Sequence, residues 1–251
     1  MAGPKTKTVS IILPTRNEAG SIAKAMDACM AEFERAGYSP QIIIADDNSQ
    51  DGTKEIINNY AKLHPNNIIP LHRSAPYGFG HSIREAIGKA EGFATVVMMA
   101  DLSDKPSDAV KMVRKVDEGF DVVFSTRFSN GGKTNNYPLS KYLANRSFNN
   151  VLRMLFLLPY ADTSNAFKAY CTSTIKSLPL KSAGFEITVE LPMLALMKGA
   201  KACEIPVSWG NREAGAPKWR IGNAFVKYSM KLMELFLLNI RSKFGRFESS
   251  K

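Results

Sequence analysis

The chain has 251 residues, which is enough for one large domain or two small ones. Hydrophobic residues make up 45% and charged residues 22%, a mixture that excludes a predominantly disordered or fibrous protein. Its three cysteines are far apart and include no CxxC pair, which argues against a disulfide framework or a cysteine-based zinc site. No apolar run is long enough for a signal peptide or a membrane span, so we expect a cytoplasmic location.

The net charge of +10 is unevenly distributed. Residues 1–126 contain 14 basic and 16 acidic residues, a net charge of −2, whereas residues 127–251 contain 19 and 7, a net charge of +12. A neutral first half followed by a basic second half predicts an anionic ligand for the second half, namely a phosphate, an acidic lipid surface or a nucleic acid.

Short β-branched runs alternate with helical patterns along the first half of the chain. The expected strands are residues 9–13, 41–45, 68–71, 95–99 and 122–125, and the expected helices between them are 21–36, 53–63 and 82–90. This alternation predicts an α/β fold, with a doubly wound, mostly parallel sheet and helices on both faces. Farther along, the pattern predicts helices at 139–158, 183–198 and 223–244, a strand at 203–207 and a polar loop at 211–220.

Polar side chains follow three successive strands of this first half. The first strand leads into Thr15 and Glu18, the second into Asp46 and Asp47, and the fourth into Asp101. Ligands of such sheets bind beyond the carboxyl ends of the strands. The two adjacent carboxylates could bind a nucleobase edge and ribose hydroxyls, or could simply solvate the turn; their mutual repulsion favours a ligand.

Three further acids have either a ligand-binding or a structural interpretation. Asp101 could hold Mg²⁺ or Mn²⁺ against a diphosphate, because one carboxylate and phosphate oxygens suffice for such an ion. Asp104, which precedes Pro106, is expected to begin the next helix instead, and Asp51 is expected to cap the helix at 53–63.

The order of these segments resembles the inverting family-2 glycosyltransferases, which have a GT-A nucleotide-sugar fold. The matching segments are PTRNE at 14–18, DDNSQDGT at 46–53 and ADLSDKP at 100–106. DTSNAFK at 162–168 is similar to a DPTSGFR-type segment of the dolichol-phosphate mannosyltransferase branch, and Glu190, EIPV at 204–207, Arg212 and Lys218 resemble later elements of that branch. The resemblance covers about residues 9–220.

The resemblance implies a single GT-A catalytic domain at 1–222, followed by a C-terminal amphipathic basic helix and tail at 223–251. Residues 1–125 would form the nucleotide-sugar half and residues 126–222 the acceptor half. The implied donor-binding residues are Pro14, Thr15, Glu18, Asp46, Asp47, Gly78 and Asp101. The implied ligands of an acceptor phosphate are Arg127, Lys141, Arg146, Arg212 and Lys218. Asp101, Arg127 and Lys218 are the expected catalytic residues, and Asp101, with Asp47 as a second candidate, is the expected metal ligand.

The chain departs from the family pattern at the metal segment. Where the family has DADLQ, this chain has Met99 in place of the first acid and Ser103 in place of the glutamine. The need for Mg²⁺ or Mn²⁺ is therefore open. Asn165 and Ala166 replace the SG of the SGF element, and Pro217 replaces the serine of the SK element, which suggests a side branch with a different donor or acceptor.

The basic residues favour a phosphate acceptor. A phosphate monoester is mostly a dianion at neutral pH and needs no general base, whereas a hydroxyl acceptor needs one. We therefore predict inverting transfer of a sugar from a nucleoside diphosphate to a polyprenyl (dolichyl-type) phosphate, as in cell-envelope glycan biosynthesis. A hydroxyl acceptor activated by Glu186, Glu190 or Asp162, and a non-catalytic nucleotide- or nucleic-acid-binding module, are the alternatives; under the first prediction no nucleic-acid partner is expected.

The predicted helix at 223–244 mixes large apolar and basic residues. It could lie in a membrane interface, with its cations on anionic headgroups, or pack on a partner chain. The first possibility would place the protein peripherally on the cytoplasmic face of a membrane.

Overall fold

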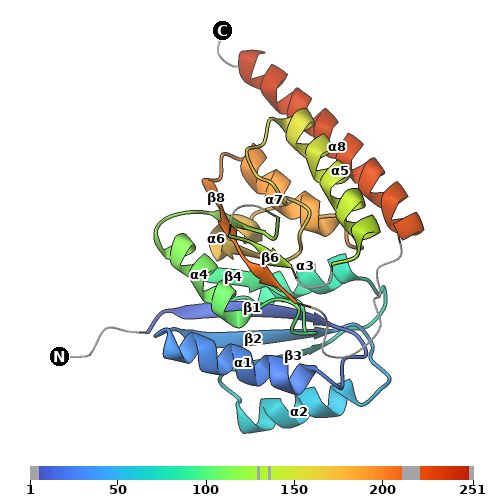
Figure 1. Ribbon diagram of the computed structural model, residues 1–251. Coiled ribbons are helices and arrows are strands. Elements are labelled where there is room, and N and C mark those ends of the chain that lie inside the picture. The colour runs from blue at the N-terminus through green and yellow to red at the C-terminus, as the bar shows by residue number, and fades with distance from the viewer. Residues whose placement is uncertain (1–5, 129–130, 135–136, 211–220, 249–251) are drawn as a thin grey trace, which may run out of the picture.

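The computed structural model describes residues 6–128, 131–134, 137–210 and 221–248 (Figure 1). Within these ranges, no helix combines the length and the hydropathy that crossing a bilayer requires.

A seven-stranded sheet forms the centre of the molecule, in the order β3-β2-β1-β4-β7-β5-β8. Its strands are β1 (Thr8–Thr15), β2 (Ser39–Asp46), β3 (Ile68–His72), β4 (Ala94–Val97), β5 (Val122–Thr126), β7 (Lys168–Cys171) and β8 (Ala202–Pro206). All neighbouring pairs are parallel except those of β7, which lies antiparallel between β4 and β5. The predicted mostly parallel sheet is confirmed, and β7 is a strand that the sequence analysis did not predict.

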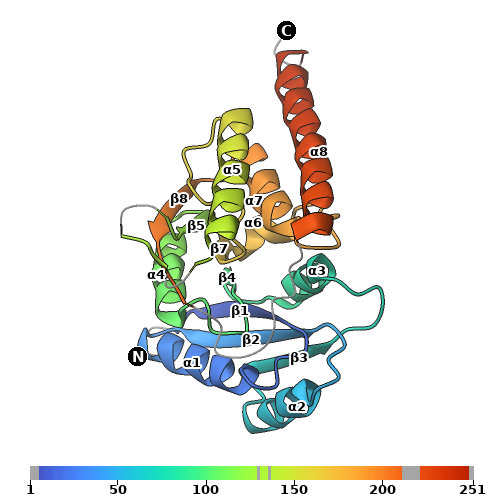
Figure 2. The same ribbon diagram turned by 45° about the vertical axis from the view of Figure 1, so that its right-hand side comes forward.

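Helices cover both faces of the sheet (Figures 1 and 2). The face with α1 (Ile22–Arg35), α2 (Thr53–Leu63) and α4 (Pro106–Asp117) contains one buried core, and the face with α3 (Phe79–Lys89), α6 (Thr172–Lys176) and α7 (Ile187–Met197) contains a second. Side chains alternate between these cores along each strand: Ile11 and Leu13 belong to the first and Ile12 to the second. This is the double winding expected from the alternating pattern.

Two long helices extend the second face beyond the sheet. α5 (Leu139–Phe156) and α8 (Ile221–Glu248) pack on α7 through a third core, which includes Leu152 and Leu235. The edge-to-face ring pairs Phe148–Tyr228 and Phe156–Phe236 show that α5 and α8 run in the same direction (Figure 1). The expected boundary between residues 222 and 223 falls in the first turn of α8.

A second, two-stranded parallel sheet joins β6 (Lys133–Thr134) to β9 (Ser208–Trp209). An isolated bridge also pairs Asp104 with Trp209, and the N–H of Gly210 donates to the carbonyl of Ser103. These contacts bring the chain after β8 next to the loop that follows β4.

Candidate active site

A cavity of about 450 Å³ opens at the carboxyl ends of β1, β2 and β4. Six of the seven expected donor residues line it, namely Pro14, Thr15, Glu18, Asp47, Gly78 and Asp101. The structure thus brings together side chains from three separate segments of the first half of the chain. We refer to this space as the acidic cavity.

The loops that form the acidic cavity contain an unusual share of left-handed backbone. Asn17, Asn48 and Leu102 have φ values of 51°, 63° and 60°, respectively, and each lies just beyond a strand that ends at the cavity. Such a conformation is costly for a leucine in particular. The turn at Leu102 separates Asp101 from Ser103, and both of these residues line the cavity.

Asp47 supports the loop that carries Gly78. One carboxylate oxygen accepts a hydrogen bond from Arg73 Nη1 at 2.5 Å, and the other accepts one from the N–H of Gly78 at 2.9 Å. Arg73 has a fully buried side chain and also contacts Glu85 at 2.6 Å. Both oxygens of Asp47 therefore accept a hydrogen bond within the protein, and its role as a second metal ligand stays a prediction.

Asp46 does not reach the acidic cavity. It is the last residue of β2 and has no exposed surface, and its carboxylate accepts hydrogen bonds from the N–H and the hydroxyl of Ser49. Successive side chains of a strand point to opposite sides, so only one member of the acid pair can face the ligand. This placement corrects the expectation that Asp46 contacts a nucleoside directly.

Asp101 and Asp104 both line the acidic cavity. Asp101 accepts hydrogen bonds from the N–H and the hydroxyl of Ser103, at 3.0 and 2.6 Å. Asp104 accepts one from the N–H of Met99 at 3.2 Å, and burial raises its pKa to about 7 despite that bond. Among the described residues, no cluster of three or more histidines, cysteines or acids could hold a metal ion.

Asp104 is a site residue that sequence reasoning missed. The helix begins at Pro106 and Lys105 is its N-cap, so Asp104 lies outside the helix and turns back toward Met99. The available signal was the proline, which favours the first position of a helix and so leaves a residue two places earlier free for another role.

A second cavity of about 320 Å³ adjoins the first. Its wall is largely apolar and includes Ala144 and Phe148 of α5, Ala166, and Tyr228 of α8. None of the described residues that line it is acidic. We refer to this space as the apolar cavity. Five residues line both cavities and mark their junction: Arg127, Lys141, Asn165, Phe185 and Trp209.

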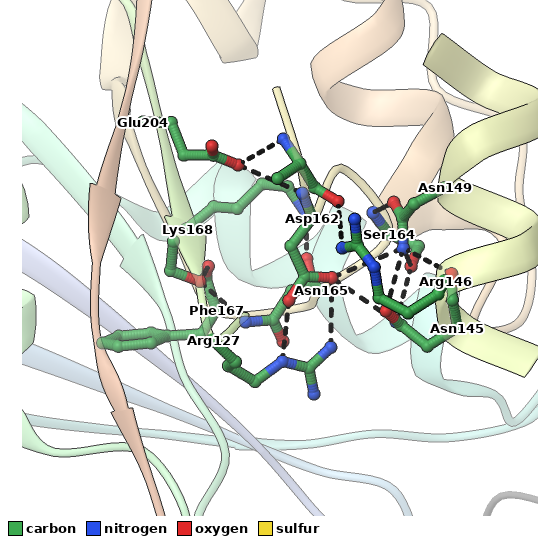
Figure 3. A network of polar contacts seen from close by, with 12 residues as sticks. Arg127, Asn145, Arg146, Asn149, Asp162, Ser164, Asn165, Phe167, Lys168 and Glu204 are labelled. Atoms are coloured by element: carbon green, nitrogen blue, oxygen red, sulfur yellow. Dashed lines mark hydrogen bonds and ion pairs between the residues drawn. The ribbon is translucent and has the colours of Figure 1, made fainter. Parts of the chain in front are cut away.

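Arg127 is held at this junction by a buried carboxylate (Figure 3). Its Nε and Nη2 lie 2.7 and 3.1 Å from the two oxygens of Asp162, which has no exposed surface. Burial is the largest single influence on the pKa of Arg127 and lowers it, but the charge and the hydrogen bond of Asp162, with Tyr137 and Asp104, together outweigh burial and raise the pKa overall. The guanidinium therefore keeps a full charge next to both cavities.

The surrounding polar network fixes Asp162 in turn (Figure 3). Asn145 and Asn149 of α5 approach its carboxylate at 3.4 and 3.5 Å, and Glu204 of β8 accepts the N–H groups of Ala161 and Asp162. Lys168 is buried beside this network, and burial lowers its pKa to about 7. Asp162 is thus a partner of Arg127 and does not line either cavity.

The other expected phosphate ligands differ in their position relative to the two cavities. Lys141 lines both cavities. Arg146 donates to the carbonyl of Ala161 at 2.9 Å and lines neither of them, and its expected contact with the acceptor stays a prediction. Arg212 and Lys218 lie outside the described residues, so their expected roles stay predictions.

Comparison with known proteins supports the family resemblance. The model of the glycosyl transferase family 2 domain matches residues 10–176. A polyprenol monophosphomannose synthase from Mycolicibacterium smegmatis is 25% identical over 219 residues, which cover 85% of this chain and 81% of that protein. A dolichol-phosphate mannosyltransferase from Pyrococcus furiosus is 26% identical over 231 residues, 90% of this chain but 63% of that longer protein.

Solved structures show the same fold. Glucosyl-3-phosphoglycerate synthase from Mycobacterium tuberculosis, in complex with Mn²⁺, uridine diphosphate and glucosyl-3-phosphoglycerate, aligns with a TM-score of 0.65 over 93% of this chain and 80% of that one, at 18% identity. A further mycobacterial protein aligns with a TM-score of 0.72 over 91% of this chain and 74% of that one, at 14% identity. The expected GT-A fold is confirmed.

Proposed function

The chain belongs to glycosyl transferase family 2, and from this premise we propose that it transfers a sugar from a nucleoside diphosphate to a polyprenyl phosphate, with inversion at the anomeric carbon. The observation that carries the proposal is the junction of an acidic and an apolar cavity at Arg127 and Lys141. In this proposal the first cavity would hold the nucleotide sugar and the second the start of the isoprenoid chain. The cations between them would bind the phosphate groups of both substrates.

The residues of the acidic cavity fit a divalent cation. Mg²⁺ and Mn²⁺ in phosphoryl sites need one or two carboxylates and take their other ligands from phosphate and water. Asp101 is such a carboxylate. Mg²⁺ or Mn²⁺ bound there would neutralise charge on the departing diphosphate.

The acids considered as a base for a hydroxyl acceptor are all engaged elsewhere among the described residues, which favours a phosphate nucleophile. Asp162 is paired with Arg127, and Glu190 accepts hydrogen bonds from two backbone N–H groups and from Lys231. Glu186 lines neither cavity. A phosphate dianion would attack the anomeric carbon without losing a proton; the new C–O bond would form on the face opposite the diphosphate, whose bond to the sugar breaks.

The outer surface of α8 supports a peripheral contact with the membrane that holds such an acceptor. Val226, Met230, Met233 and Leu237 are between 48% and 69% exposed, and their spacing of four, three and four residues puts them on one side of the helix. Lys227 and Arg241 are also exposed on this helix. An apolar stripe beside cations is typical of helices that lie in the interface of an anionic membrane, which would be its cytoplasmic face here.

Transfer to a purified polyprenyl phosphate in detergent, with UDP- and GDP-sugars and Mn²⁺ or Mg²⁺, tests the proposed reaction. We expect a lipid-linked sugar from the wild-type chain and none from Asp101→Ala, whereas Asp117→Ala on the outside of α4 should retain activity. Failure of every donor with the lipid, together with transfer to a simple sugar alcohol, would contradict the proposal.

Sedimentation with vesicles tests the membrane contact. The wild-type chain should sediment with vesicles of phosphatidylglycerol and phosphatidylcholine, and Met230→Asp/Leu237→Asp should lower that binding by about tenfold or more. Leu63→Asp is the matched control, because Leu63 is 73% exposed at the end of α2. Equal binding of all three chains would place the contact elsewhere.

A hydroxyl acceptor is the second candidate, and Asp104 is the observation that favours it. A carboxyl group with a pKa near 7 could act as a general base at neutral pH. In that case Asp104→Asn would abolish transfer at every pH. If the acceptor is a phosphate, the same variant should retain most of its kcat.

A further inference from the structure

Residues 181–186 form a wall that lines both cavities on one side and packs on the other against the start of α3 at Gly78 and Gly80, which we call the donor loop. Gly184 and Phe185 line the acidic cavity, and Phe185 also lines the apolar cavity. The backbone of Ser182 and Ala183 lies against Gly78 and Gly80 so closely that a Cβ atom on either glycine would collide with it. From the sequence, this segment was expected only to begin a helix and to supply Glu186 as an alternative base.

Two contacts join this wall to the donor loop. The N–H of Gly80 donates to the carbonyl of Ala183 at 2.9 Å, and the ring of Phe79 stacks on that of Phe185 with centroids 4.4 Å apart. Gly78 is in turn bonded to Asp47. A displacement of the wall would therefore move the loop that Asp47 holds at the edge of the acidic cavity.

The other side of the wall is held by α7 and α8. Glu190 of α7, which is 2% exposed, accepts the N–H groups of Lys181 and Ser182 at 3.1 and 2.8 Å. Lys231 of α8 donates to the same carboxylate at 2.9 Å. The hydroxyl of Tyr228, also on α8, donates to the carbonyl of Phe185 at 2.9 Å.

The charges agree with this geometry. Burial raises the pKa of Glu190, but the hydrogen bonds from Ser182 and Lys231 outweigh burial and lower it overall. The buried negative charge of Glu190 is therefore stabilised by its hydrogen-bond partners. Without Lys231, that charge would be left with backbone donors alone. Tyr228 and Lys231 lie three residues apart on the side of α8 that faces the protein, opposite its exposed apolar stripe.

We propose that Lys231 and Tyr228 are positioning residues of the sugar-transfer site: through Glu190 and Phe185 they fix the 181–186 wall, and with it the donor loop at Gly78 and Gly80. The inference rests on the proposed function only in taking the acidic cavity as the nucleotide site. It makes α8 a part of the donor site as well as the helix that meets the membrane.

Nucleotide affinity measured by calorimetry, with UDP and GDP in the presence of Mn²⁺, tests the proposal on the full-length chain. Lys231→Met should weaken the affinity by about tenfold and Tyr228→Phe by about threefold. Lys231→Arg, which keeps the charge, should restore most of it. Glu234→Gln is the matched control, because Glu234 contacts Lys231 from the solvent side and, among the described contacts, does not bond to the wall.

Circular dichroism at the assay temperature separates positioning from unfolding, since partial unfolding lowers the number of binding sites without changing the affinity of the folded fraction. If Lys231→Met does not fold, the affinity of Tyr228→Phe tests the proposal instead, because that substitution removes a single hydroxyl group and should leave the fold intact. Folded variants with wild-type affinity would overturn the proposal. A wild-type chain that binds nucleotide but transfers no sugar to polyprenyl phosphate would contradict the proposed function. The affinities of the variants would still test the positioning role of Lys231 and Tyr228.

Discussion

Arg127 and Asp162 form a two-point ion pair at the junction of the two cavities, with contacts of 2.7 and 3.1 Å and almost no exposure to solvent. The two residues are 35 positions apart, and the polar network around α5 holds the carboxylate in place. The pair fixes both the position and the charge of the guanidinium.

We expect Arg127→Lys to lower the rate of transfer by about 10- to 100-fold, because a lysine cannot make the two parallel contacts that orient the cation. Arg127→Met should also unfold more easily, by about 3–5 kcal/mol, since it leaves the carboxylate of Asp162 buried without its partner. Initial rates and urea unfolding of the two variants check this. Equal rates for Arg127→Lys and the wild type would show that the orientation of Arg127 does not contribute to the transfer reaction.

Met99 lines the acidic cavity where the family has an acid. Met99→Asp adds a carboxylate beside Asp101 and should tighten Mn²⁺ binding by about tenfold, because affinity rises with the number of charged ligands. Met99→Asn is the control of similar size without the charge. Calorimetric titration with Mn²⁺ in the presence of UDP or GDP measures the change; an unchanged affinity would mean that position 99 does not face the ion.

The raised pKa of Asp104 predicts a pH dependence of stability in EDTA. Between the ordinary value of 3.8 and about 7, the folded chain keeps this carboxyl protonated while the unfolded chain has lost the proton. The folded state binds more protons, so this group lowers the free energy of unfolding as pH rises through that window, by a total on the order of 4 kcal/mol.

Asp104→Asn should remove that contribution and be the more stable chain at pH 8, where the wild-type carboxyl is ionised. Denaturant unfolding of both chains at pH 4.5 and pH 8 gives the difference. A difference that does not grow between the two pH values would show that the carboxyl is not shielded from solvent.

Gly80 and Gly88 lie on the same helix and provide a matched pair for testing the close approach of the wall. A Cβ on Gly80 would collide with the backbone of Ser182 and Ala183, whereas one on Gly88 meets nothing within 4 Å. Gly80→Ala should raise the KM for the donor by about tenfold or more, because the wall must shift. Gly88→Ala should leave KM unchanged and stabilise the helix by about 1 kcal/mol. Steady-state kinetics and thermal unfolding check both.

Much of the first half of the site was predictable, because strand ends at one edge of a parallel sheet must converge. Pro14, Thr15, Glu18, Asp47 and Asp101 were expected at that edge and line one cavity. Which of Asp46 and Asp47 lines the cavity depends on where β2 ends and the turn begins. The residue pattern alone does not fix that position.

The second half was less predictable because tertiary contacts decide it. β7 has only four residues and no long apolar run, yet it is buried between two strands that flank it in space and not in sequence. The 181–186 wall owes its position to Glu190, Tyr228 and Lys231, which come from two helices. No local signal in those residues indicates that they meet.

The antiparallel strand β7 also has a consequence for how the protein is made. β4 ends at Val97, but its neighbour in the sheet begins at Lys168 and the last strand at Ala202. Such pairings between distant segments slow folding, and they leave strand edges open until the partner arrives. During synthesis on the ribosome, the edge of β4 therefore stays unpaired while about seventy more residues are translated, and in that interval the nascent first half of the sheet is most exposed to aggregation and to chaperones.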